Sequence, residues 1–248
     1  MASVLTINKV ISFPDKIENT VIGKEEVIIE GKSDVAETSF SKGSDNSKNI
    51  EGYNRYIIKH SQKFKIEGKL WDKSFKSILR IMKATVYESK NNRDFLFSIG
   101  NLKADYIQSA FARLRSKTSI KSEPLEVDLI EAVEKIILYA PDIKIISGWF
   151  SELNLPNLKN VMLQGDKVNL GPEWDRFKTT KGAKLSNIEL LIDDADFENG
   201  VVTVSLSKRG VIFSRRNISH KKLLQISNKI IGILNKELKT KKLKVKNK

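Results

Sequence analysis

The chain has 248 residues, of which 40% are hydrophobic and 30% are charged, and it contains no cysteine. This length allows a sizeable buried core, and the apolar fraction excludes a chain that is disordered throughout. The lack of cysteine excludes disulfides and thiolate metal sites. No apolar run approaches the roughly 20 residues that cross a bilayer, and the first residues lack a secretion-signal pattern. These features predict a soluble, cytoplasmic protein.

The positive charge is concentrated near the C-terminal end. The formal net charge of +14 comes from 44 basic and 30 acidic residues. The 41 residues from Lys208 onward hold fourteen of the basic residues and one acid, Glu237, so the preceding 207 residues are nearly neutral. This asymmetry favours a polyanionic partner, either nucleic acid or an anionic membrane surface. A general enrichment in lysine, which supplies 35 of the 44 cations, is the alternative explanation.

The first 70 residues are rich in side chains that favour β-structure. Strands are predicted at residues 4–13, 26–30, 53–59 and 63–67. Residues 32–52 contain many Ser, Asn and Gly residues and predict a flexible loop. The sequence therefore predicts a β-rich region over residues 1–70.

Helices are predicted to dominate the middle of the chain, within an α+β region over residues 71–238. The clearest helical pattern is an apolar repeat at three- and four-residue spacing, formed by Trp71, Phe75, Ile78, Leu79, Met82 and Val86. A second repeat, from Tyr106 to Leu114, follows a predicted strand at 94–99. A third helix is predicted to begin at the N-cap Ser122, with Pro124 in its first turn, and to end before Pro141.

The last third is predicted to return to strands and to end in a helix. Strands are expected at 143–150 and 160–164, followed by an antiparallel meander with turns at Asn199-Gly200 and 207–210. Ser219 then caps an amphipathic helix whose apolar positions run from Leu223 to Leu238. Residues 239–248 are predicted to be a basic, disordered tail. The predicted fold class is therefore α+β.

The leading functional candidates are the basic residues around the start of the last helix, namely Lys208, Arg209, Arg215, Arg216, His220, Lys221 and Lys222. Cations in the first turn oppose the helix macrodipole, which favours negative charge there by about 0.3–1 kcal/mol. A bound phosphate would compensate, because helix N-termini and arginine side chains both bind phosphate. Ser219 would either cap the helix or contact the same anion. The alternative is a solvated surface that keeps the protein soluble.

The lysine-rich tail, with Lys241, Lys242 and Lys244, would add salt-sensitive affinity for nucleic acid that is independent of base sequence. In a eukaryotic cell it would also serve as a nuclear localisation signal. Its lack of Trp or Phe makes binding to a membrane surface unlikely. An inert, disordered end is the alternative.

Few residues suggest catalysis. His60 and His220 are the two histidines, so a multi-histidine metal centre is excluded, and both are predicted to lie at the surface. A basic group around Arg113 at the end of the 106–114 helix is predicted to complement the helix dipole. No glycine-rich phosphate loop is present. We therefore predict no cofactor and no metal, and the sequence favours a non-enzymatic function.

One carboxylate pattern suggests a different function. Pro14-Asp15, followed by the apolar run 27–29 and then by Glu30-Gly31-Lys32, resembles the bipartite metal-binding signature of restriction-endonuclease-like nucleases. The resemblance implies that Asp15 and Glu30 hold Mg²⁺ and that Lys32 orients or activates the attacking water. An ordinary strand that ends in a turn is the alternative explanation.

The favoured function is nucleic-acid binding, to DNA or RNA, through backbone phosphates, with Arg215, Arg216, Lys221 and Lys222 as central contacts. The chain would act alone or as a subunit of a larger assembly. The metal-dependent nuclease and a non-catalytic protein-interaction or structural subunit are the two alternatives.

Overall fold

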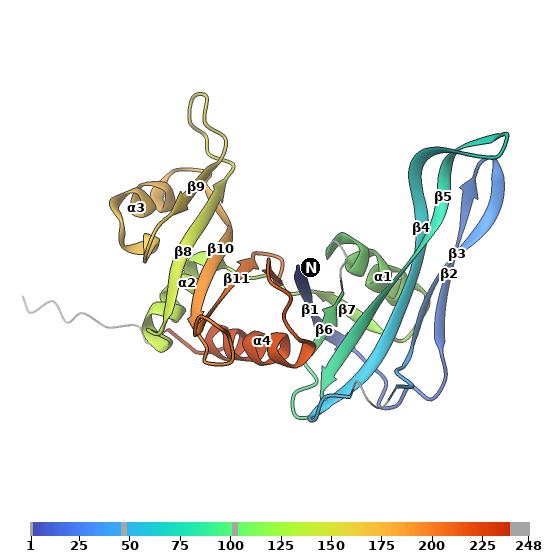
Figure 1. Cartoon of the computed structure of the whole chain (residues 1–248), viewed down its shortest axis with the longest axis horizontal. Coiled ribbons are helices and arrows are strands. Elements are labelled where there is room, and N and C mark those ends of the chain that lie inside the picture. The colour runs from blue at the N-terminus through green and yellow to red at the C-terminus, as the bar shows by residue number, and fades with distance from the viewer. Residues whose placement is uncertain (1, 46–48, 101–103, 239–248) are drawn as a thin grey trace, which may run out of the picture. The chain divides into compact units, whose positions relative to one another are not determined.

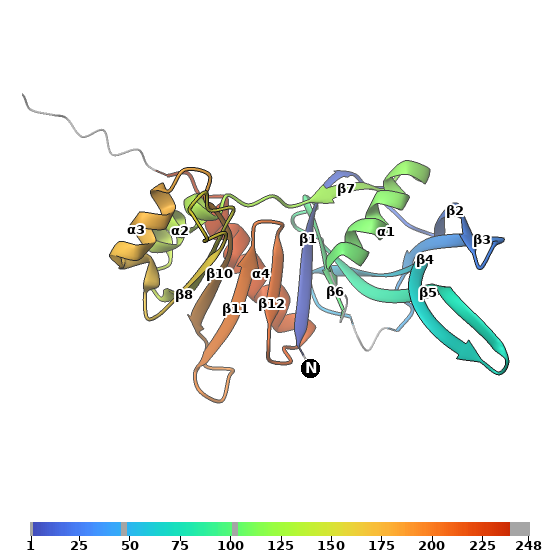
Figure 2. The same ribbon diagram turned by 90° about the horizontal axis from the view of Figure 1, so that it is seen from above.

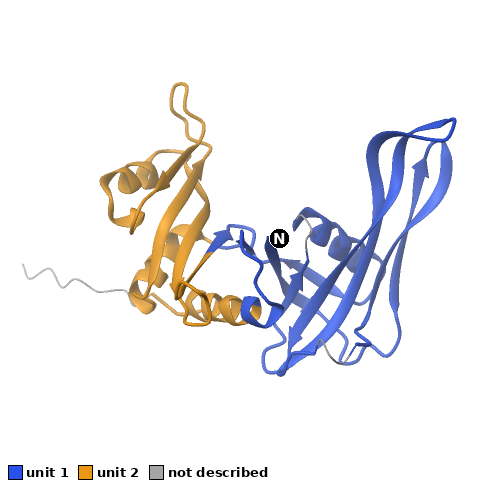
Figure 3. Ribbon diagram, viewed as in Figure 1, with its two compact units in different colours: residues 1–127, 204–223 blue, residues 128–203, 224–248 orange. Residues whose placement is uncertain are grey.

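A computed structural model of the chain describes residues 2–45, 49–100 and 104–238 (Figure 1). These residues contain four α-helices and twelve strands in antiparallel arrangement, with 22% of the chain in helices and 48% in strands. The protein is therefore α+β, with strands predominating. Two compact units are present (Figure 3): residues 1–127 with 204–223 form unit 1, and residues 128–203 with 224–248 form unit 2.

Unit 1 is built on a long antiparallel sheet. Its strands lie in the order β2, β3, β4, β5, β6, β1, β12 and β11, and β7 pairs with the end of β1. Their bounds are β1 (Ser3–Ser12), β2 (Val21–Ile29), β3 (Lys32–Lys42), β4 (Tyr53–Leu70), β5 (Lys73–Ser89), β6 (Phe95–Ile99), β7 (Lys121–Pro124), β11 (Val201–Ser207) and β12 (Val211–Ser214). The sequence-based boundary at residue 70 falls in the turn between β4 and β5, whose close pairing keeps both strands in one unit.

Helix α1 (Ala104–Lys117) covers one face of this sheet (Figure 2). Its apolar stripe packs on alternate residues of the strands, because successive side chains of a strand point to opposite faces. The resulting core is formed by Ile17, Phe40, Tyr56, Ile58, Ala84, Val86, Leu96, Ile107, Ala110, Phe111, Leu114 and Ile120. Phe40 stacks on Tyr56 with ring centroids 5.1 Å apart. Residues between these core positions on β4 and β5 must face the opposite side of the sheet.

A buried polar network also holds α1 on the sheet. The Arg113 guanidinium donates to the Ser61 carbonyl over 2.7 Å and to Glu25 over 2.8 Å. The same guanidinium lies 3.3 Å from His60 Nδ1, and Thr38 Oγ1 lies 2.7 Å from that nitrogen. Since a guanidinium can only donate, Nδ1 must accept, which leaves the ring proton on Nε2. The prediction that His60 lies at the surface is wrong, because pairing with polar partners allows His60 and Arg113 to be buried together.

Unit 2 has its own strands and core. Its elements are α2 (Leu129–Tyr139), β8 (Ile143–Ser151), β9 (Val161–Gln164), the 3-10 helix η2 (Val168–Leu170), α3 (Pro172–Thr179), β10 (Lys184–Asp193) and most of α4 (His220–Leu234). Strand β8 lies between β10 and β9. Trp174 packs directly over Gly148, where a Cβ would lie 2.3 Å from the indole ring. A side chain at position 148 would therefore displace Trp174 from the core.

Several local predictions are confirmed and others are wrong. The predicted strands at 94–99, 143–150 and 160–164 are present as β6, β8 and β9, and the second and last helices are present as α1 and α4. The helix predicted from Trp71 to Val86 is wrong, because residues from Lys73 onward form β5 and Trp71 lies in the turn before it. Sixteen residue pairs join β5 to β4. This long-range pairing outweighs the helical spacing of the apolar residues, and β-branched residues such as Ile81 and Thr85 suit the strand.

Two further predictions are wrong for similar reasons. The loop expected at 32–52 contains β3 over residues 32–42, which pairs with β2 through the Glu30-Gly31 turn and with β4. Ser122 does not cap a helix but lies in β7, and Asp128 caps α2 instead, accepting from two backbone N–H groups. Helix α3 was not predicted. Within the described residues, none of the helices combines the length and the apolar character that would span a bilayer.

The network around His60 predicts a stability that depends on pH. Burial, and then the charge of Arg113, lower the His60 pKa from 6.5 to about 4. Between these values the unfolded chain binds more protons than the folded chain, so the free energy of unfolding falls as the pH falls, by roughly 3 kcal/mol. Urea unfolding between pH 7 and pH 4 measures this loss. His60→Gln should lose less stability over that range, and equal losses in both proteins would contradict the assignment.

Candidate anion-binding pocket

The structure divides the predicted basic cluster into two groups. Lys208 and Arg209 lie in the turn before β12, whereas Arg215 and Arg216 follow its last residue. The four residues of β12 separate these groups by about 13 Å. Arg209 forms an ion pair with Asp105 over 3.8 Å in an exposed position. Lys208 and Arg209 therefore do not belong to the same site as the residues that follow β12.

The second group is held at the start of α4. Ser3 Oγ accepts from the Ile218 N–H over 2.8 Å and donates to the Ile218 carbonyl, which folds residues 215–219 back toward β1. Ser219 Oγ accepts from the Lys222 N–H over 3.3 Å, and the Ser219 carbonyl accepts from the Leu223 N–H. Ser219 therefore acts as the N-cap of α4. Arg215 and Arg216 are exposed in this segment.

Helix α4 begins at a pocket on the face of β4 and β5 that points away from α1. Arg55 and Ile57 on β4 alternate with the core residues Tyr56 and Ile58, and on β5 Lys83, Thr85 and Tyr87 alternate with core residues in the same way. The pocket has a volume of about 610 Å³. Its described lining consists of Asn49, Ile50, Arg55, Ile57, Lys83, Thr85, Tyr87, His220 and Lys221.

The pocket is strongly cationic. Arg55, Lys83 and Lys221 contribute three positive charges, and no carboxylate is present among the described residues that line it. The positive end of the α4 dipole lies at the same place. Arg55 is partly fixed by a 3.0 Å hydrogen bond from its Nη1 to the Asp45 carbonyl. Its Nε is buried and has no hydrogen-bond partner in the described structure. A buried donor without a partner costs free energy, and the described residues around Arg55 do not compensate that cost.

His220 contributes to the pocket as a neutral side chain. Burial and the nearby charge of Arg55 both lower the His220 pKa, so the ring is uncharged at neutral pH. Tyr87 Oη lies 2.9 Å from His220 Nδ1, and burial raises the Tyr87 pKa, which keeps its hydroxyl protonated. The hydroxyl can therefore donate to Nδ1, leaving Nε2–H as the donor of the ring. The first-turn cation expected at His220 is thus absent at neutral pH, and Lys221 carries the charge at the pocket.

The three residues of the nuclease-like pattern do not form one site. Arg93, just beyond the end of β5, donates to Asp15 over 2.8 Å. Glu30 accepts from the Lys76 N–H and from Ser77 Oγ near the beginning of the same strand. The twelve positions between Ser77 and Ser89 span roughly 40 Å of strand.

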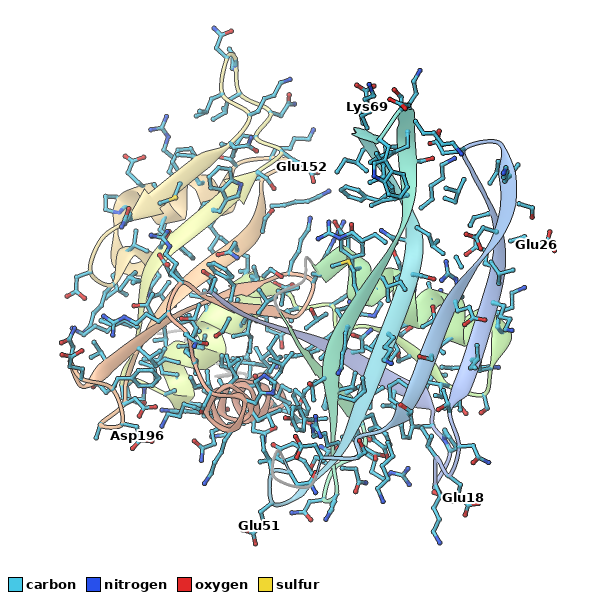
Figure 4. All side chains as sticks on the ribbon, turned by 45° about the vertical axis from the view of Figure 1, so that its right-hand side comes forward. Glu18, Glu26, Glu51, Lys69, Glu152 and Asp196 are labelled. Carbon is cyan, nitrogen blue, oxygen red and sulfur yellow. The ribbon has the colours of Figure 1, made fainter. Side chains whose placement is uncertain are left out.

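Figure 4 shows the two ends of unit 1, with Glu18, which follows Asp15 in the chain, far from Lys69 near the β4–β5 turn. Lys32 lies beside Glu30, at the start of β3. Within the described residues, no three His, Cys, Asp or Glu side chains form a group that could hold a metal ion.

Part of the pocket is predictable from the sequence, but its walls on β4 and β5 are not. His220 and Lys221 were among the predicted residues, whereas Arg55, Lys83 and Tyr87 were missed. The period-two alternation of 83, 85 and 87 was the available signal, but it was hidden by the helix predicted over the same residues. Lys241, Lys242 and Lys244 lie outside the described residues. Comparison with protein-family models, curated protein sequences and solved structures found no match.

The effect of Arg55 on His220 gives a direct test of the pocket. Replacing Arg55 with Gln removes a positive charge, so the His220 pKa should rise while burial keeps it below the usual value. NMR titration of the two histidine rings measures this change. His60, whose pKa is lowered by burial and Arg113, provides an internal control that should not move. An unchanged His220 pKa would show that Arg55 does not act on this ring.

Proposed function

We propose that this protein binds nucleic acid through backbone phosphates, with the pocket of Arg55, Lys83 and Lys221 as a phosphate site. The observation that carries the proposal is the convergence of three cations from two strands and a helix, with no carboxylate among the described residues around them. Like charges brought together in this way repel one another, and an anion relieves that repulsion. The same site would accept a phosphate from DNA or RNA.

The chemistry of the pocket supports a nucleotide unit rather than a simple inorganic anion. Its volume of about 610 Å³ lies in the range of pockets that hold small organic ligands. Ile50 and Ile57 add apolar wall area, and Asn49 and Thr85 add polar groups that can contact a sugar. A sugar-phosphate unit, with one charged and one less polar part, matches this combination.

The charges around the pocket favour a polymer over a free nucleotide. Arg215 and Arg216 are exposed in the segment that leads into α4, and no ion pair joins either side chain to another described residue. They extend the cationic surface beyond the pocket, where further phosphates of the same strand would lie. Lys222, in the third position of α4, is half-buried and contributes less exposed charge. Counterion release from several phosphates then supplies most of the affinity.

The proposal predicts a measurable change in salt dependence. Lys83→Gln and Lys221→Gln remove two exposed cations from the pocket without disturbing the core. For a single-stranded oligonucleotide, the slope of log affinity against log salt should become shallower by about 1.4, because each lost phosphate contact removes about 0.7. Fluorescence anisotropy across a salt series measures the slope for the full chain and the double variant.

Two matched variants separate the pocket from general charge effects. Lys9→Gln with Lys90→Gln removes two exposed lysines of unit 1 that do not line the pocket, and it should leave the slope nearly unchanged. Substitution of Lys241, Lys242 and Lys244 by Gln tests the tail in the full chain. Loss of all binding in the tail variant, with no effect of the pocket variant, would overturn the pocket assignment. A wild-type chain without salt-dependent affinity for DNA or RNA would refute the proposal and support the protein-interaction alternative.

A further inference from the structure

The β4–β5 hairpin extends beyond its neighbours as a two-stranded arm. Strand β3 pairs with β4 at residues 56–60, and β6 pairs with β5 at residues 85–88. Residues 61–81, here called the arm, form a strand ladder only between the two halves of the hairpin within the described structure. Glu30, in the turn between β2 and β3, contacts the middle of the arm through its bonds to Lys76 and Ser77, so the part of the arm nearer its turn extends beyond this contact. The outer end of the arm, near Lys69, projects from the rest of unit 1 (Figure 4).

The turn of the arm exposes a tryptophan in an unfavourable backbone conformation. The Trp71 side chain is 86% exposed, and its φ angle is 51°. The left-handed region suits Gly, Asn or Asp in a hairpin turn, and a bulky side chain adopts it at a cost. Neighbouring Leu70 is 59% exposed. An exposed indole that burial does not stabilise, at a position that disfavours it, indicates a use outside the folded chain.

Basic side chains are distributed along both strands of the arm, up to its turn. The arm contains six basic residues, all exposed, against two acids, Glu67 and Asp72. The basic residues are Lys63, Lys65, Lys69, Lys73, Lys76 and Arg80. Lys69 and Lys73 lie closest to the turn, where Leu70 pairs with Lys73 and Lys69 pairs with Ser74. An aromatic ring flanked by cations is the arrangement by which proteins hold single-stranded nucleic acid without regard to its sequence.

We propose that the arm holds single-stranded nucleic acid, with an unpaired base stacked on Trp71 and the adjoining phosphates bound by Lys69 and Lys73. The inference rests on the proposed nucleic-acid function and adds a second contact surface to it. Every base has a flat face, so a single exposed ring at the turn can accept any base. The lysines farther along the arm follow the strand toward the body of unit 1.

The arm fits an anionic membrane surface less well. Asp72 directly follows Trp71, so insertion of the indole into a bilayer would carry a carboxylate toward the hydrocarbon, which is costly. The basic residues are also spread over about 20 Å of the arm rather than gathered at one depth. Both features are compatible with a nucleic-acid strand, which is surrounded by water and carries charge along its length.

Tryptophan fluorescence of the full chain tests the arm. Titration with single-stranded oligothymidylate should quench the wild-type signal, and Trp71→Leu should remove that quenching and weaken binding about tenfold or more. Trp71→Phe keeps an aromatic ring and should retain most of the affinity. Trp149→Phe replaces the other partly exposed tryptophan, which is 42% exposed in β8, and should still show quenching. Circular dichroism confirms that each variant is folded.

The outcomes separate this inference from the proposed function. If the oligonucleotide binds with a slope that depends on Lys83 and Lys221, but Trp71→Leu binds as tightly as wild type without loss of quenching, the arm proposal fails alone. If the wild-type chain does not bind nucleic acid, both proposals fail. Quenching by vesicles of phosphatidylserine and phosphatidylcholine, but not by the oligonucleotide, would assign the arm to a membrane. Stronger quenching by a duplex than by the single strand would also overturn the stacking model.

Discussion

The antiparallel pairing of β4 with β5 is the constraint on which the rest of unit 1 depends. Because alternate residues of a strand face opposite sides, this one ladder supplies Tyr56 and Val86 to the core under α1 and Arg55 and Lys83 to the pocket on the other face. Beyond the neighbouring strands the same ladder continues as the arm. A shift of the register by one residue would exchange the two faces and place lysine in the core.

Each of the two histidines lies near an arginine, but the two arginines differ in whether a carboxylate balances their charge. Beside His60, the guanidinium of Arg113 is matched by Glu25, and the network holds a helix on a sheet. Beside His220, the charge of Arg55 has no carboxylate partner among the described pocket residues, and its Nε has no hydrogen bond to any residue that the structure describes. Both rings are kept neutral by burial and an adjacent cation. The first arrangement is complete within the described chain, whereas the second has the charge distribution that the proposed phosphate site requires.

The distribution of charge gives the two proposed contact surfaces different roles. The pocket brings cations from separate elements to one concave position, where the proposed phosphate would be held by convergent charge. The arm spreads its cations along a narrow, exposed ladder that ends at Trp71, where the proposed affinity would come from stacking as well as from charge. A polymer can occupy both kinds of surface, and a small anion can occupy only the pocket.

The sequence by itself determined the class of the fold, the helices α1 and α4, and the cationic character around Lys221, because helical periodicity, capping and charge are local properties. Tertiary structure decided the rest. The apolar residues between 71 and 86 have helical spacing, but pairing with β4 makes residues 73–86 part of a strand, and this long-range contact has no local signature. The pocket joins Arg55 and Lys83 to His220 across more than a hundred residues of chain. Such a site exists only when the sheet has formed, because no segment of the sequence contains enough of it to be recognised.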